Sequence, residues 1–307
     1  NHYQKLYFHK LGTPQAADML VYQRKDQKEW GFEPMVTEDG KYLVIHVWKG
    51  TDPKSAAFYK DLTRPDAPVV ELLNKFDAAY EFLGNEGPVF WFITDLDAPR
   101  QRIVAIDTTN PDRKPWKELV PQHTETLLKA RVVHDRFIVT YLSDAKSKAR
   151  IFDLDGKPVH ELALPGIGTV DGFPGMRHDE ETFFSFTSFS TPAEIWHLDL
   201  LTNKTTLFKR PKLAFDPAAF ETRQVFFTSK DGTKVPMFLT GKKGFIPHHL
   251  LHRTVAILAG DAGAHMPLVV ELHVVGHVVH LDPRHLLAPV VVRRELLHLG
   301  PVGPHDL

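Results

Sequence analysis

Short apolar runs separated by polar turns recur along most of the chain. The runs are rich in Val, Ile, Phe and Tyr, a pattern typical of β-strands rather than helices. One kind of run closes on an aspartate followed by Leu or Thr, and successive copies of it lie 46 residues apart. The four aspartates are Asp61, Asp107, Asp153 and Asp199. We interpret them as acceptors for backbone N–H groups of the following turns, not as catalytic groups.

A period of 46 residues lies in the range of β-propeller blades, and the runs predict four strands in each repeat. The aspartate runs form one strand of each repeat, and the abundant aromatic residues are expected to fill the space between blades. The other predicted strands are 42–48, 89–93, 137–142 and 182–189 before the aspartate runs, 69–73, 116–120, 159–164 and 205–209 after them, and 79–83, 127–133 and 169–173 as runs that link the repeats.

The first repeat is preceded by part of another. Residues 4–11 and 19–22 read as two strands of an earlier blade, so the chain starts within a blade and holds about four and a half blades up to residue 211. Propellers normally close into a ring. We therefore expect an incomplete propeller or an open arc, whose exposed blade faces offer a surface for self-association.

A hairpin pattern follows the last repeat. Residues 224–239 alternate around an Asp231-Gly232 turn. The stretch SKDGTKVPMF at 229–238 resembles the segment by which prolyl oligopeptidases pass from their propeller into an α/β-hydrolase domain. Further stretches resemble that family in the same order, including QKLYFHKLGT at 4–13, EDGKY at 38–42 and KKG at 242–244.

The resemblance implies a fold and a function. In that family a seven-bladed propeller covers a serine-peptidase domain that cleaves short peptides after proline. We therefore predict a mainly β chain: an incomplete seven-bladed β-propeller over 1–211, a linker and entry hairpin of the α/β-hydrolase domain over 212–244, and an atypical tail over 245–307. Two alternatives stay open, a stand-alone β-propeller that binds proteins and a relative of oligopeptidase B.

The chemistry of the family needs a serine on a G-x-S-x-G turn with Asp and His partners. The sequence contains no G-x-S-x-G, and no serine follows Ser229. We assign no catalytic residue and expect this chain to be inactive by itself. The resemblance implies substrate contacts at Trp48 and at Thr51 in the loop 50–53, with ordinary packing as the alternative; Gly31, at another such position, offers no side chain.

The composition narrows the classes of binding partner that we expect. With 37 basic and 38 acidic residues the net charge is −1, which gives no reason to expect nucleic acid or an anionic membrane. Cysteine is absent, which excludes thiolate metal sites, and no apolar run is long enough for a membrane helix. The expected partners are short proline-containing peptides, without a cofactor. The chain begins at Asn1, so we take its true N-terminus to be absent and leave the compartment open between cytoplasm and periplasm.

The last residues differ from the rest. Residues 246–307 hold ten of the 18 histidines but no Lys, Ser or aromatic residue. We interpret this His/Val/Leu/Pro-rich tail as out-of-frame or disordered sequence. Metal binding is the competing interpretation, but no H-E-x-x-H pattern accompanies the histidines, and we predict no metal site. Under the competing interpretation the metal ligands would be His273, His277, His280, Asp282 and His285.

Overall fold

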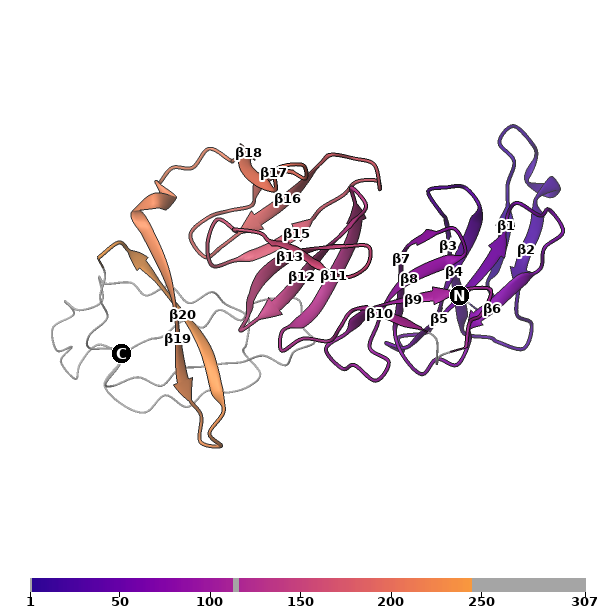
Figure 1. Ribbon diagram of the computed structural model, residues 1–307, viewed down its shortest axis with the longest axis horizontal. Coiled ribbons are helices and arrows are strands. Elements are labelled where there is room, and N and C mark those ends of the chain that lie inside the picture. The colour runs from indigo at the N-terminus through magenta and orange to yellow at the C-terminus, as the bar shows by residue number, and fades with distance from the viewer. Residues whose placement is uncertain (1, 113–115, 245–307) are drawn as a thin grey trace, which may run out of the picture. The chain divides into compact units, whose positions relative to one another are not determined.

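The computed structural model describes residues 2–112 and 116–244 (Figure 1). The chain divides into two compact units. The first comprises the residues up to Thr187 together with 193–211, and the second comprises 188–192 and the residues from Lys212 onward. The tail 245–307, with its predicted out-of-frame character and its candidate histidine ligands, lies outside the described residues.

Four antiparallel sheets of four strands make up most of the first unit. In each sheet the strands pair in sequence order, which is the arrangement of a propeller blade. The predicted partial β-propeller is therefore confirmed. The strands of the four sheets are β3 (Trp30–Val36), β4 (Tyr42–Lys49), β5 (Ser55–Asp61) and β6 (Val69–Leu73); β7 (Tyr80–Glu86), β8 (Val89–Thr94), β9 (Arg102–Asp107) and β10 (Lys117–Val120); β11 (Thr126–Val133), β12 (Arg136–Ser143), β13 (Lys146–Asp153) and β14 (Pro158–Glu161); and β15 (Thr169–Gly172), β16 (Glu181–Thr187), β17 (Glu194–Asp199) and β18 (Lys204–Lys209).

Consecutive sheets pack face to face because their central strands are apolar on both faces. In β8, Phe90 and Phe92 point into the core shared with the first sheet, whereas Trp91 and Ile93 point into the core shared with the third. Neighbouring residues of a strand face opposite sides, so an uninterrupted apolar run fills two cores. The same alternation in β12 places Phe137 against the second sheet and its neighbour Ile138 against the fourth.

A two-stranded hairpin precedes the first sheet. It consists of β1 (Lys5–Phe8) and β2 (Met19–Gln23), joined through the short 3-10 helix η1 (Gln15–Ala17). Leu6 and Tyr22 of the hairpin pack on the face of the first sheet that is turned away from the second. The hairpin thus takes the place of half a preceding blade, which agrees with the expected four and a half blades.

Some strand boundaries differ from the prediction. The strand β3 had no counterpart among the predicted runs, because it contains Gly31 and Pro34, both unusual within a strand. The strand β16 ends at Thr187 rather than 189, and β14 covers 158–161 rather than 159–164. Among the described residues, no helix has the length and hydropathy that crossing a membrane requires.

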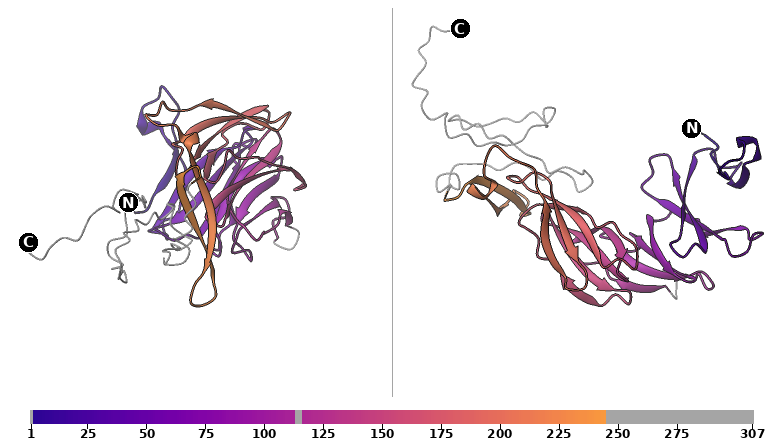
Figure 2. Two further views of the ribbon diagram at one scale, coloured as in Figure 1. Left: turned by 90° about the vertical axis from the view of Figure 1, so that its left-hand side faces the viewer. Right: turned by 90° about the horizontal axis from the view of Figure 1, so that it is seen from above.

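The second unit contains the hairpin that the Asp231-Gly232 turn predicted. The 3-10 helix η2 (Pro217–Ala219) leads into β19 (Phe220–Thr228), which pairs with β20 (Lys234–Lys242) along its full length (Figures 1 and 2). Gly232 has φ +87°, a conformation that favours glycine. The Asp231 side chain accepts a hydrogen bond from the Ser229 hydroxyl and another from the Thr233 N–H, and together they lower the pKa of Asp231 to about 2.

Candidate functional site

The up-and-down order of the strands gives the sheets two distinct ends. At one end, here called the linker end, the chain passes from one sheet to the next and the second strand turns into the third; it includes residues 50–54, 95–101, 121–125 and 144–145. At the other, the turn end, the first strand turns into the second; it includes 37–41, 87–88, 134–135 and 173–180. Trp48 and Thr51, the two predicted substrate contacts, both lie at the linker end.

Trp48 lies near the end of β4, opposite Gly31 of β3. A Cβ atom added at residue 31 would lie 2.0 Å from Cε2 and Cζ2 of the Trp48 indole, so the ring rests directly on the glycine backbone. Trp48 is half-buried. Gly31, which offers no side chain to a ligand, is therefore what allows the Trp48 ring to lie flat against the sheet.

Thr51 is exposed at the tip of the loop between β4 and β5. The far side of that loop is tied to the second sheet. Lys54 Nζ lies 2.8 Å from Asp95 Oδ2, and the other carboxylate oxygen of Asp95 accepts the Ala79 N–H at 2.7 Å. Thr51 is thus an exposed residue on a loop whose base is anchored, and it follows Trp48 by three residues in the sequence.

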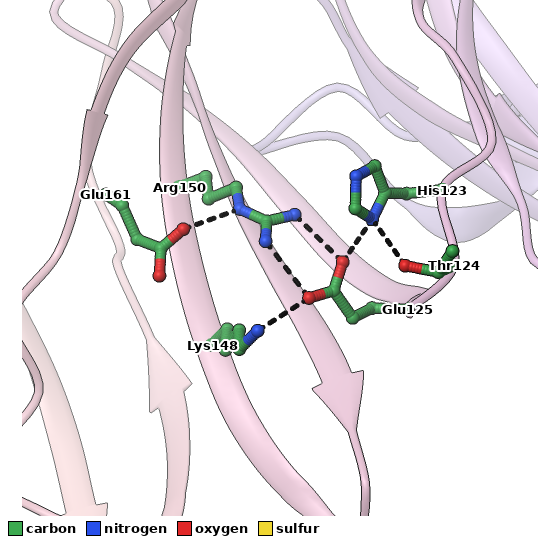
Figure 3. Close-up of polar contacts among 6 residues, drawn as sticks. All are labelled: His123, Thr124, Glu125, Lys148, Arg150 and Glu161. Atoms are coloured by element: carbon green, nitrogen blue, oxygen red, sulfur yellow. Dashed lines mark hydrogen bonds and ion pairs between the residues drawn. The ribbon is translucent and has the colours of Figure 1, made fainter.

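A charged cluster that the sequence patterns did not predict occupies the linker end of the third sheet (Figure 3). Its centre is Glu125, whose side chain is only 10% exposed. Arg150 donates to both Glu125 oxygens, at 3.1 and 3.0 Å, and Lys148 donates to one of them at 2.7 Å. Arg150 also donates to Glu161 at 2.9 Å. His123 makes a further ion pair with Glu125.

The hydrogen bonds of the cluster shift the pKa of Glu125. Burial alone would raise the pKa of Glu125, but hydrogen bonds from Arg150 and Lys148 outweigh it and lower that pKa to about 2. The Arg150 guanidinium also stacks over the Tyr141 ring, with Cζ 4.9 Å from its centroid, and burial raises the pKa of Tyr141 to about 12. Through these contacts the arrangement fastens the linker 121–125 to the third sheet.

The repeated aspartates act as the sequence predicts. Each accepts backbone N–H groups of the turn that follows its strand: Asp61 from Thr63, Asp107 from Thr109, Asp153 from Asp155 and Lys157, and Asp199 from Leu201 and Thr202. Hydrogen bonds, chiefly from the Thr63 and Thr109 hydroxyl groups, lower the pKa of Asp61 and Asp107. These carboxylates are turn caps.

Within the part of the chain that the structure describes, no group of three or more His, Asp or Glu side chains is placed to hold a metal ion. The candidate ligands His273, His277, His280, Asp282 and His285 lie outside the described residues. The two predicted contacts at the linker end are a half-buried indole and an exposed hydroxyl on an anchored loop.

Comparison with known proteins supports the β-propeller fold. The family model for the prolyl oligopeptidase N-terminal β-propeller domain matches residues 1–211. A prolyl endopeptidase of Elizabethkingia miricola is 33% identical over 240 residues, which cover 78% of this chain and 34% of that protein. Prolyl oligopeptidase A of Amanita bisporigera is 28% identical and covers 78% of this chain and 32% of that protein.

Solved structures give the same result. A prolyl endopeptidase structure, from a study of inter-domain dynamics in catalysis and specificity, superposes with a TM-score of 0.72 at 38% identity, covering 79% of this chain and 36% of that one. Prolyl oligopeptidase B of Galerina marginata superposes with a TM-score of 0.74 at 26% identity, covering 80% and 36%.

The chain thus spans about a third of the length of the relatives it matches. The sheets, their order and the matched sequence agree on one assignment. The chain belongs to the prolyl oligopeptidase family, and its residues 1–211 match that family's N-terminal β-propeller domain.

Proposed function

We propose that this chain supplies part of the substrate-admitting propeller of a prolyl oligopeptidase and does not supply the peptidase chemistry. The match of the four stacked sheets to the family's propeller domain carries the proposal. The sequence supports it, since it contains no G-x-S-x-G motif. We also propose that residues 212–244 form the linker and entry hairpin toward a hydrolase domain.

The partners in this proposal are short proline-containing peptides. Relatives of the chain are named prolyl endopeptidases, and one Galerina structure holds a 35mer hydrolysis and macrocyclization substrate. We place the peptide contact at Trp48 and Thr51. An aromatic face next to an exposed hydroxyl suits a proline ring and its neighbouring peptide carbonyl.

Peptide binding tests this placement. A fluorescently labelled proline-containing octapeptide is titrated with the full chain, and its anisotropy gives the Kd. Replacing Trp48→Leu should weaken binding about tenfold, which corresponds to about 1.4 kcal/mol. Trp116→Leu is the matched control, because the Trp116 indole donates to the Pro111 carbonyl at the turn end. Equal affinity of the Trp48 variant and the wild type would remove Trp48 from the site.

A second copy of the chain is the other partner we propose. Among the described residues no strand pairs with the outer edges of the β1–β2 hairpin, and several large apolar side chains are exposed on the hairpin and at the end of β3. Exposed apolar surface next to a free strand edge favours association. Sedimentation velocity should show a concentration-dependent dimer that Met35→Lys weakens; a monomer at every concentration would contradict this. The exposed residues are Tyr7, Phe8, Met19, Leu20, Met35 and Val36.

A further inference from the structure

The loop between the first and second strands of the fourth sheet is unlike its counterparts. The corresponding turns of the second and third sheets, 87–88 and 134–135, are tight, and that of the first sheet covers 37–41. In the fourth sheet the connection runs over 173–180. It is long enough to reach the turn ends of the other sheets.

Arg177 in this loop contacts the third sheet and the first. Its Nε donates to Asp135 Oδ1 at 2.7 Å, and its carbonyl oxygen accepts the Asp135 N–H at 2.8 Å. Its own backbone N–H donates to Glu38 Oε2 at 3.0 Å, across 139 residues of sequence. A single residue therefore links the turn ends of the first, third and fourth sheets.

The Arg177 guanidinium also contacts the second sheet. It donates to the Asn85 carbonyl oxygen at 2.9 Å and lies 2.6 Å from Glu86 Oε2, while Cζ stands 5.4 Å from the centroid of the Trp91 ring. The side chain is 19% exposed. Multiple charge-assisted bonds from one planar guanidinium are specific in geometry and stronger than neutral hydrogen bonds.

The first and second sheets are also joined directly, since Asn85 Nδ2 donates to Asp39 Oδ2 at 3.1 Å. Around Arg177, three carboxylates gather from three different sheets: Glu38, Glu86 and Asp135. The guanidinium lies between Glu86 and Asp135, whose like charges would otherwise repel one another, and the backbone N–H of Arg177 binds Glu38.

We infer that the loop 173–180 is a strap, anchored by Arg177, that holds the turn ends of all four sheets together. In repeat proteins each unit normally contacts only its neighbours, so local opening at one end need not affect the other. Here Arg177 couples the fourth sheet directly to the first, and this contact does not run through the cores of the sheets between them. The strap fixes how far the sheets can spread at the turn end, and it does so whether or not the linker end binds peptides.

Hydrogen exchange of the full chain, followed by mass spectrometry, tests the strap. Arg177→Met keeps an unbranched stem over Trp91 and removes the charge. It should accelerate amide exchange about tenfold at 85–87 and 134–135, because these turns lose the guanidinium that joins them, whereas 38–41 keeps the bond from the backbone N–H of residue 177. Exchange at the linker-end turn 144–145 should stay unchanged. Arg177→Lys should restore part of the protection, since a lysine keeps the charge but not the fork of donors.

Arg131→Met is the matched control. Arg131 pairs with Glu81 at 3.6 Å and both side chains are about half exposed, so this variant should leave exchange at the turn end unchanged. Glu38→Gln, an exposed substitution, should raise exchange at 176–178 by a smaller factor of about two to three. Unchanged exchange at 85–87 and 134–135 in Arg177→Met, or faster exchange spread evenly over both ends, would overturn the strap.

Discussion

Two interfaces of the first unit differ in completeness. Between the second and third sheets, Trp91 and Phe137 meet edge to face with ring centroids 5.5 Å apart, and their strands β8 and β12 are buried along most of their length. At the other interface, the two strands of the β1–β2 hairpin lie against the four-stranded first sheet. There Met35 and Val36 at the end of β3 remain 51% and 56% exposed.

The difference shows what a blade contributes to its neighbour. A strand such as β8 fills two cores only because a full sheet lies on each side. Where half a sheet is present, the same kind of apolar run leaves part of its surface in water, and the buried area per residue falls. Stability in this unit should therefore depend on the interfaces between complete sheets more than on the hairpin.

The largest expected effect is a truncation in the complete interface. Phe137 is 0% exposed, and Phe137→Ala should lower the free energy of unfolding by about 3–5 kcal/mol through lost burial and an unfilled cavity. Tyr7→Ala in the hairpin removes a ring that is 48% exposed and should cost about 1 kcal/mol or less. Urea unfolding followed by tryptophan fluorescence gives both values. Similar losses would mean that the hairpin interface is as important as the complete one.

The next effect concerns charge and pH. Because the pKa of Glu125 falls from an ordinary 4.5 to about 2 on folding, its contribution is present above pH 4.5 and is lost as the pH falls toward 2. Glu125→Gln should cost at most about 3 kcal/mol at pH 7. Thermal melts from pH 7 to pH 2.5 should show the variant and the wild type converging.

The segment between the hairpin and β3 offers a matched carboxylate. Asp26 pairs with Arg24 at 2.7 Å, and the hydrogen bonds from Arg24 hold the pKa of Asp26 well below its usual range. Its side chain is largely exposed, however, so solvent screens the pair and Asp26→Asn should change the melting temperature far less than Glu125→Gln. A larger shift for Asp26→Asn would reverse the ranking of the two regions.

A smaller effect is expected at Gly31. Adding one methyl group in Gly31→Ala forces the Trp48 ring off the sheet and should cost about 1–3 kcal/mol. Gly166→Ala is the control, since its added Cβ would have Phe186 as its nearest contact at 4.0 Å. The double variant Gly31→Ala, Trp48→Leu should recover part of the loss in urea unfolding. Full additivity of the two changes would show that the ring and the glycine are not coupled.

Much of the fold could be predicted from the sequence because the repeat is local. The 46-residue interval and the aspartate at the end of each third strand depend on turns a few residues long, and Asp61 and Asp107 cap such turns as expected. The Asp231-Gly232 hairpin was equally readable, since its signal lies within the turn. The strand β3 was missed because Gly31 and Pro34 weaken its pattern.

The linker end and the strap could not be predicted in the same way. Glu125 meets Arg150 through pairing of strands that bring them together across 25 residues, and Arg177 meets Glu38 across 139 residues. No periodicity marks either contact. The seating of Trp48 on Gly31 depends on the register of β3 against β4, which single-sequence patterns do not specify.

The most direct test of the account combines binding and cleavage in one sample. The purified chain is incubated with an unlabelled octapeptide containing one internal proline, and mass spectrometry follows the peptide while titration calorimetry measures its binding. A propeller part that contacts peptides without peptidase chemistry predicts measurable binding and an intact octapeptide after prolonged incubation. A product cut on the carboxyl side of the proline, formed in proportion to the amount of chain, would contradict it.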